Sequence, residues 1–152
     1  AACLRLAGAG KAAVELVADG VHLAPETVET VFQLVGADNV VLVTDAMAAA
    51  GLPDGDYALG RSAVTVRSGM ATLQGTDTLA GGTATLLDVV RRTIDAGVSP
   101  AEAVASATSV PARGLGLEAE IGSLRAGMRA DVVVVDQEFE LVGVMRGGEV
   151  FS

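Results

Sequence analysis

Apolar runs and an amphipathic segment alternate over the first third of the chain. Residues 14–18 (VELVA) and 40–44 (VVLVT) each predict a short strand, and the second run is typical of a strand buried on both faces. Between Pro25 and Gly36, apolar residues recur at i, i+3, i+4 and i+7, which predicts a helix bounded by these two residues. A strand, a helix and a strand in so short a span form a βαβ unit. We therefore expect parallel strands whose carboxyl ends share one side of the sheet.

Two further helices are predicted after the βαβ unit. The first runs from about Leu86 to Gly97, with apolar residues on one face. The second begins at Ser99-Pro100-Ala101-Glu102, a capping box with proline at the first helical position, and continues to about Thr108. Pro111 is expected to break it.

Glycine-containing turns predict two β-hairpins. Ser68-Gly69 separates the apolar runs 63–67 and 70–73, and Gly147-Gly148 separates 141–145 from 149–151. The four valines at 132–135 predict one more strand before the second hairpin. The chain is therefore expected to be α/β, with a β unit at its C-terminal end.

Polar residues follow both predicted strands of the βαβ unit. Asp45 ends the second strand and precedes small residues, so it enters a loop where parallel α/β folds gather catalytic groups. Such a carboxylate acts as a general base, a general acid or a metal ligand, or it only caps the loop. His22, the only histidine, follows the first strand and is either structural or a hydrogen-bonding partner of a substrate oxygen or phosphate. Asp19, in the same loop, is interpreted as a turn former with Gly20.

Two other segments carry candidate groups. The loop Leu79-Ala80-Gly81-Gly82-Thr83 could present backbone groups to a ligand before a helix, or it is an ordinary turn. Arg113 is interpreted as a structural ion-pair partner. One histidine and scattered carboxylates do not supply the three clustered protein ligands of a catalytic metal, so no metal site is predicted within this chain.

Composition narrows the class of protein. The chain has 152 residues, 51% hydrophobic but only 3% aromatic, so aliphatic side chains must build the core. The net charge of −9 and the lack of a basic stripe argue against nucleic acid as a partner. No apolar run reaches the roughly 18 residues of a membrane span. Cys3 is the only cysteine, which excludes an internal disulfide and favours a cytoplasmic protein. The chain does not begin with methionine, and we expect it to be a fragment.

Several of these segments, in this order, resemble the N-acetylglucosamine-6-phosphate deacetylases of the amidohydrolase superfamily. Asp19-Gly20-Val21-His22 resembles the D-G-x-H loop of that family, and Leu42 to Met47 (LVTDAM) resembles its V-T-D-A segment. Leu79-Ala80-Gly81 resembles its L-x-G loop. The tail Gly122-Ser123-Leu124, Gly127 and Ala130-Asp131-Val132 resembles the pattern shared across amidohydrolases.

The resemblance implies a (β/α)₈ barrel with a small β-sandwich domain. Residues 1–115 would be the C-terminal part of the barrel, with its last two strands and the helices that follow. Residues 116–152 would be the terminal strands of the small domain. Such a barrel takes about 250 residues, so this chain would hold only part of it.

The resemblance also implies a reaction. One divalent metal ion, zinc or iron, would be bound by a glutamate and two histidines on earlier strands, outside this chain. Asp45 would accept a proton from the attacking water and later protonate the leaving amine, releasing acetate and glucosamine 6-phosphate. His22 would hydrogen-bond the sugar phosphate, and Leu79, Ala80 and Gly81 would offer main-chain contacts to the substrate. Relatives of this family are commonly homodimers.

Two alternatives stay open. Another metal-dependent amidohydrolase, such as a dihydroorotase-like cyclic amidase, fits the shared tail equally well. The chain could instead be a non-catalytic piece that only associates through the exposed edges of an incomplete barrel.

Overall fold

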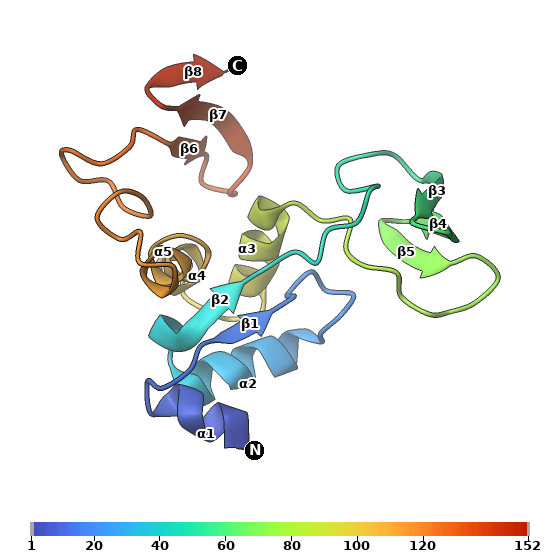
Figure 1. The fold of residues 1–152 in the computed structure, drawn as a ribbon, viewed down its shortest axis with the longest axis horizontal. Coiled ribbons are helices and arrows are strands. Elements are labelled where there is room, and N and C mark those ends of the chain that lie inside the picture. The colour runs from blue at the N-terminus through green and yellow to red at the C-terminus, as the bar shows by residue number, and fades with distance from the viewer. Residues whose placement is uncertain (1, 152) are drawn as a thin grey trace.

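Two short parallel strands lie at the centre of the structure, a computed structural model in which residues 2–151 are described (Figure 1). β1 (Val14–Leu16) pairs with β2 (Val40–Leu42), and Val14 lies opposite Val40. Helix α2 (Pro25–Val35) and the 3₁₀ turn η1 (Ala37–Asn39) connect the two strands. The predicted βαβ unit with parallel strands is therefore confirmed.

Helix α2 follows the apolar spacing of its sequence. Pro25 occupies the first turn, where the missing N–H costs nothing, and Gly36 ends the helix with a φ of 78°. Val28, Phe32 and Val35 are buried against the strands in a core that also contains Leu16, Val40 and Leu42.

The strand pair is covered on one face only, which corrects the expectation of a strand buried on both faces. Val40 and Leu42 are buried, but Val41 between them is half-exposed, and its partner Glu15 is exposed. Helix α1 contacts β1, and helices α3, α4 and α5 contact β2.

The helices differ from the prediction at two points. An additional helix, α1 (Ala2–Gly8), precedes β1. Helices α3 (Leu86–Asp95) and α4 (Pro100–Ala107) form as predicted, but Pro111 lies within a further helix, α5 (Ser109–Gly114), instead of ending α4. The chain bends at Thr108, and Pro111 is tolerated because its missing N–H falls in the first turn of α5. No helix between residues 2 and 151 combines the length and apolar character that spanning a bilayer requires.

A separate antiparallel sheet is inserted between β2 and α3. Strands β4 (Ser62–Arg67) and β5 (Met70–Leu73) form the predicted hairpin, and β3 (Gly55–Leu59) adds a third strand that the sequence did not predict. Its own small core contains Met47, Val64, Val66, Ala71 and Ala80. In Figure 1 this sheet projects away from the βαβ unit, and β1 and β2 both point towards it.

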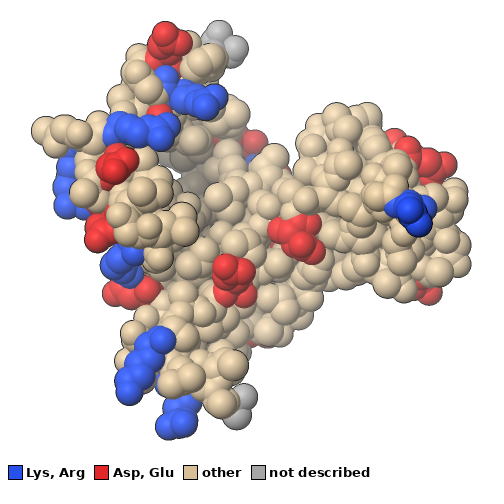
Figure 2. Space-filling model, viewed as in Figure 1, with Lys and Arg blue, Asp and Glu red and all other residues tan. Residues whose placement is uncertain are grey.

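The C-terminal end forms a third sheet from β6 (Val132–Val135), β7 (Leu141–Arg146) and β8 (Glu149–Phe151). The strands follow the predicted pattern, and many of their apolar side chains are exposed. On the face shown in Figure 2, charged side chains are scattered over a surface that is mostly neither acidic nor basic.

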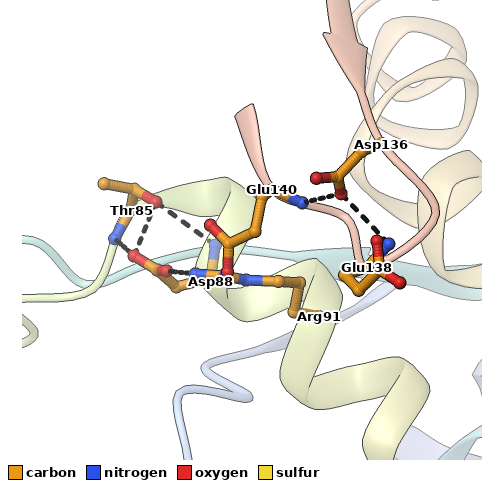
Figure 3. Close-up of polar contacts among 6 residues, drawn as sticks. All are labelled: Thr85, Asp88, Arg91, Asp136, Glu138 and Glu140. Atoms are coloured by element: carbon orange, nitrogen blue, oxygen red, sulfur yellow. Dashed lines mark hydrogen bonds and ion pairs between the residues drawn. The ribbon is translucent and has the colours of Figure 1, made fainter. Parts of the chain in front are cut away.

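Polar contacts attach this C-terminal sheet to helix α3 (Figure 3). Arg91 of α3 forms ion pairs with both Asp88, one turn earlier, and Glu140, in the β6–β7 connection. The Asp136 carboxylate accepts hydrogen bonds from the backbone N–H groups of Glu138 and Glu140, which shapes that connection. Phe139, in the same connection, packs against the core beneath α3.

Candidate active site

The loop after β1 is organised by the side chain of Asp19. Its Oδ1 accepts hydrogen bonds from the backbone N–H groups of Val21 and His22, both at 2.9 Å. Its Oδ2 lies 2.9 Å from Nδ1 of the His22 ring. Only 3% of the Asp19 side chain is exposed. The predicted turn former thus also holds the imidazole, a contact that the sequence interpretation missed.

The environment of Asp19 favours its ionised form. Burial acts to raise the pKa of this carboxyl, but hydrogen bonds from the His22 and Val21 backbone, together with the ring and charge of His22, outweigh it. The net effect is a pKa below the ordinary value of an aspartate. Asp19 is therefore an acceptor for every group that surrounds it.

His22 and Asp45 face each other across the carboxyl ends of the two parallel strands. Nε2 of His22 lies 3.7 Å from Oδ2 of Asp45. The His22 side chain is 20% exposed, whereas that of Asp45 is 63% exposed. Parallel pairing of β1 and β2 places both residues on one side of the sheet, as the βαβ prediction required.

The backbone of Asp45 is held by the loop that precedes α3. Asp45 has a φ of 49°, in the left-handed region, and its carbonyl accepts a 2.6 Å hydrogen bond from Gly82 N–H. Met47 N–H donates to the Gly82 carbonyl at 2.9 Å, and Ala46 forms a parallel bridge with Gly82. A loop far along the chain therefore fixes the conformation in which Asp45 presents its carboxylate.

Of the three predicted contact residues in this loop, Gly81 packs against the Asp45 backbone, and Leu79 forms an isolated bridge with Thr72. Ala80 is buried in the core of the inserted sheet and donates to the Ala71 carbonyl at 3.0 Å, while Leu79 is partly exposed. Gly81 has a φ of 96°, and a Cβ there would lie 3.0 Å from the Asp45 carbonyl oxygen. The N–H of Gly81 and the carbonyl of Ala80 form no hydrogen bond with other described residues. The loop thus offers main-chain groups and not side chains.

The residues present do not fit a complete metal site. Across residues 2–151, no group of three histidine, cysteine, aspartate or glutamate side chains lies close enough to hold a metal ion. His22 already has one ring nitrogen committed to Asp19, so only Nε2 of His22 and the carboxylate of Asp45 face the site, which makes two ligating residues. A metal at this position would need ligands from outside this chain.

Neither the cavity beside α3 nor Arg113 belongs to this site. A cavity of about 400 Å³ lies between α3 and the β6–β7 connection and is lined by neither His22 nor Asp45. Arg113 has a structural role, as predicted, because its guanidinium donates to the Asp38 carbonyl at 2.9 Å and lies 3.3 Å from the Asp38 carboxylate. The site at the strand ends is accordingly an open surface in this chain.

Comparison with known proteins places the chain in a family. A profile of the amidohydrolase family matches residues 4–151. The chain is 38% identical over 153 residues to a putative N-acetylgalactosamine-6-phosphate deacetylase of Escherichia coli K12, covering 97% of this chain and 90% of that relative. It is 37% identical over 131 residues to the N-acetylglucosamine-6-phosphate deacetylase of Vibrio furnissii, covering 84% of this chain but 32% of the relative.

Solved structures agree with these matches. A mutant N-acetyl-D-glucosamine-6-phosphate deacetylase of Mycobacterium smegmatis, in complex with N-acetyl-D-glucosamine-6-phosphate, superimposes with a TM-score of 0.88 at 41% identity. The match covers 97% of this chain and 39% of that one. The deacetylase of Thermotoga maritima gives a TM-score of 0.83 at 37% identity, over 91% of this chain and 38% of that one.

The chain therefore spans nearly all of the short E. coli relative but only about a third to two-fifths of the longer relatives. Its α/β fold is shared with the deacetylase structures, and the family profile runs over almost its whole length. The chain belongs to the amidohydrolase family.

Proposed function

We propose that this chain contributes the acid–base half of an active site that hydrolyses the N-acetyl group of N-acetylglucosamine 6-phosphate. The products are glucosamine 6-phosphate and acetate. The observation that carries this proposal is the position of Asp45, a largely exposed carboxylate at the end of a parallel strand, 3.7 Å from the only imidazole of the chain. Deacetylases at 37–41% identity, one of them solved with the sugar phosphate bound, support it.

In this proposal Asp45 moves the proton. Its carboxylate accepts a proton from the water that attacks the amide carbonyl, and it returns that proton to the nitrogen as the C–N bond breaks. Such a group must reach both water and leaving group, which its exposure allows. His22 hydrogen-bonds the sugar phosphate through Nε2, and the main-chain groups of Leu79, Ala80 and Gly81 contact the substrate.

The proposed fold places these residues at the end of a (β/α)₈ barrel. β1 and β2 are its last two strands, residues 1–115 are the C-terminal part of the barrel, and residues 116–152 are terminal strands of a small β-sandwich domain. The uncovered face of β1 and β2, with Glu15 exposed, is compatible with further strands closing around it. The proposed divalent metal, zinc or iron, is assigned to ligands on those further strands. Homodimer formation and a cytoplasmic location complete the proposal.

A second substrate is favoured by a specific observation. Two E. coli relatives at 38% identity are N-acetylgalactosamine-6-phosphate deacetylases, one of them putative. The two sugars differ only in the orientation of one hydroxyl, so Asp45 would serve as acid and base for both. The choice between them depends on contacts to that hydroxyl.

The test is acetate release from both sugar phosphates by two proteins. One is the 152-residue chain, and the other is the same chain joined to an upstream barrel segment, each assayed with added zinc and with added iron. We expect turnover only by the longer protein. Turnover by the 152-residue chain alone would contradict the assignment of metal ligands to other strands. Turnover of a cyclic amide, with none of either sugar phosphate, would favour the dihydroorotase-like alternative.

If neither protein turns over any of these amides while the 152-residue chain self-associates in sedimentation velocity, the non-catalytic alternative holds. The exposed apolar residues of the C-terminal sheet, such as Val142 at 65% and Val150 at 72% exposed, would supply the contact surface.

A further inference from the structure

We propose that Asp19 is a positioning residue that fixes the ring of His22, with Nδ1–H directed to Asp19 and Nε2 directed to the reaction site. The tautomer and the orientation follow from this chain alone. What Nε2 contacts in the active protein rests on the function proposed above.

The geometry leaves one arrangement of protons on the neutral ring. An ionised carboxylate has no proton to donate, so the 2.9 Å contact between Asp19 Oδ2 and His22 Nδ1 requires a proton on Nδ1. Asp19 is ionised because three hydrogen bonds converge on a side chain that is 3% exposed. In the neutral imidazole, Nε2 is then the acceptor.

The contact also fixes the direction of the ring. Asp19 Oδ1 accepts hydrogen bonds from the backbone N–H groups of Val21 and His22, and Oδ2 contacts the ring of His22. One carboxylate therefore fixes both the backbone and the imidazole of His22. Nε2 points towards Asp45, at 3.7 Å, and forms no hydrogen bond within residues 2–151. A ring held in this way loses little freedom when a substrate group reaches Nε2.

Two uses of Nε2 follow for a sugar phosphate. A neutral ring accepts a hydrogen bond from a sugar hydroxyl, whereas a doubly protonated ring donates one to a phosphate oxygen. Asp19 is compatible with both, since its oxygen accepts the Nδ1 proton in either form and selects the Nδ1–H form of the neutral ring.

A role limited to the turn can be separated from this positioning role by one substitution. In Asp19→Asn the carbonyl oxygen can still accept from Val21 and His22, so the turn is kept. The amide nitrogen replaces Oδ2 and donates to Nδ1, which forces the neutral proton onto Nε2. The loop is therefore expected to keep its conformation, while donor and acceptor exchange places in the hydrogen bond between residue 19 and the His22 ring.

The experiment is a long-range ¹H–¹⁵N NMR spectrum of the 152-residue chain, titrated upward until the ring is neutral. Because His22 is the only histidine, one imidazole gives the whole signal. We expect a protonated Nδ1 and an unprotonated Nε2 in the wild type, and the reverse in Asp19→Asn. Asp136→Asn is the matched control, because Asp136 also accepts from two backbone N–H groups, at 3.0 and 2.8 Å, but does not contact His22.

A wild-type spectrum with the proton on Nε2 would overturn the inference without any variant. An Asp19→Asn spectrum identical to that of the wild type, with the amide spectrum still folded, would overturn it too. In the longer, active protein, Asp19→Asn should raise KM for the sugar phosphate by roughly tenfold and change kcat less, which is the lower end of the effect of replacing the carboxylate partner of a metal-bound histidine. The expected tautomer with no turnover by the longer protein would reject the proposed function alone.

Discussion

Nε2 of His22 and Oδ2 of Asp45 lie 3.7 Å apart although they belong to loops that follow two different strands. The distance exceeds that of a hydrogen bond, and it leaves both atoms able to contact a third group between or beside them. Parallel pairing of β1 and β2 brings the two loops to the same end of the sheet, so the fold and not a direct hydrogen bond brings the two side chains together.

Asp45→Asn should nearly abolish turnover by the longer, active protein. The amide cannot take up the proton of the attacking water, and we expect acetate release to fall by at least about 10²-fold. The melting temperature should stay near that of the wild type, because 63% of the Asp45 side chain is exposed. Asp77→Asn, at an exposed site on the inserted segment, is the control and should leave both quantities unchanged. Near-normal turnover in Asp45→Asn would remove Asp45 from the proton transfer.

Gly81→Ala should damage both stability and turnover. A Cβ at Gly81 would lie 3.0 Å from the Asp45 carbonyl and 3.1 Å from Met47 Cβ, and the φ of 96° is unfavourable for alanine. Gly75→Ala is the matched control, since Gly75 has a φ of 77° with no atom within 4 Å of its Cβ position. We expect about 1 kcal/mol of lost stability at Gly75, from the positive φ, and a further loss of about 1–3 kcal/mol at Gly81 from crowding.

Urea denaturation measures the stability difference, and acetate release by the longer protein measures the functional one. Equal losses in the free energy of unfolding for Gly81→Ala and Gly75→Ala would show that the loop rearranges around the new Cβ without a free-energy penalty. In that case the close packing of Gly81 on Asp45 would not constrain the carboxylate.

Thr85→Ala should lower the free energy of unfolding by about 1 kcal/mol, the usual value of an N-cap. The Thr85 hydroxyl accepts from Asp88 N–H at 3.2 Å, and Asp88 Oδ2 accepts from Thr85 N–H at 2.9 Å, completing a capping box at α3. Thr30→Ala, in the middle of α2, removes a hydroxyl that bonds only the Glu26 carbonyl. It should be neutral or slightly stabilising, because alanine has the higher helix propensity. A loss in Thr30→Ala as large as that in Thr85→Ala would contradict the capping argument.

Acid should weaken the fold through Asp88 as well as Asp19. Burial acts to raise the pKa of the Asp88 carboxyl, but hydrogen bonds from Thr85, together with the hydrogen bond and charge of Arg91, bring it below the ordinary value. A carboxyl with a depressed pKa contributes stability above its unfolded pKa, about 3.9 for aspartate, and loses that contribution as the pH falls through the folded pKa. The melting temperature should therefore decline below about pH 4.

Asp88→Asn should make this decline shallower, because the amide does not titrate. The measurement is thermal unfolding followed by circular dichroism from pH 7 to pH 2.5. A wild-type and an Asp88→Asn profile of the same slope would show that Asp88 does not take part in the acid response.

The periodicity of the sequence predicted the elements around the site. Strands with β-branched runs and a helix with an i, i+3, i+4, i+7 face have patterns that depend only on neighbouring residues, and β1, α2 and β2 formed accordingly. Strand β3 was missed because its own residues are nearly all exposed. An exposed edge strand lacks the apolar alternation that the prediction uses.

The contacts within the site depend on information that a local pattern does not contain. The three-residue spacing of Asp19 and His22 is compatible with a turn, but only the folded loop shows that Oδ2 reaches the ring. Likewise, Gly82 pairs with Ala46 only after the chain between them has formed the sheet of β3, β4 and β5 and returned to the βαβ unit. Long-range pairing of this kind is fixed by the tertiary structure and leaves no periodic signal.

The bridge between Ala46 and Gly82 has a consequence for how such a chain can vary. Everything between these two residues, including β3, β4 and β5, leaves and rejoins the βαβ unit at adjacent points. An insertion whose ends are neighbours can be lengthened or trimmed at its outer turns without moving its base, whereas its core must be kept because Met47 and Ala80 pack in it. The outer turns of the sheet are therefore positions where new recognition surface can be added to the segment that follows Asp45, while the backbone that holds its carboxylate is left as it is.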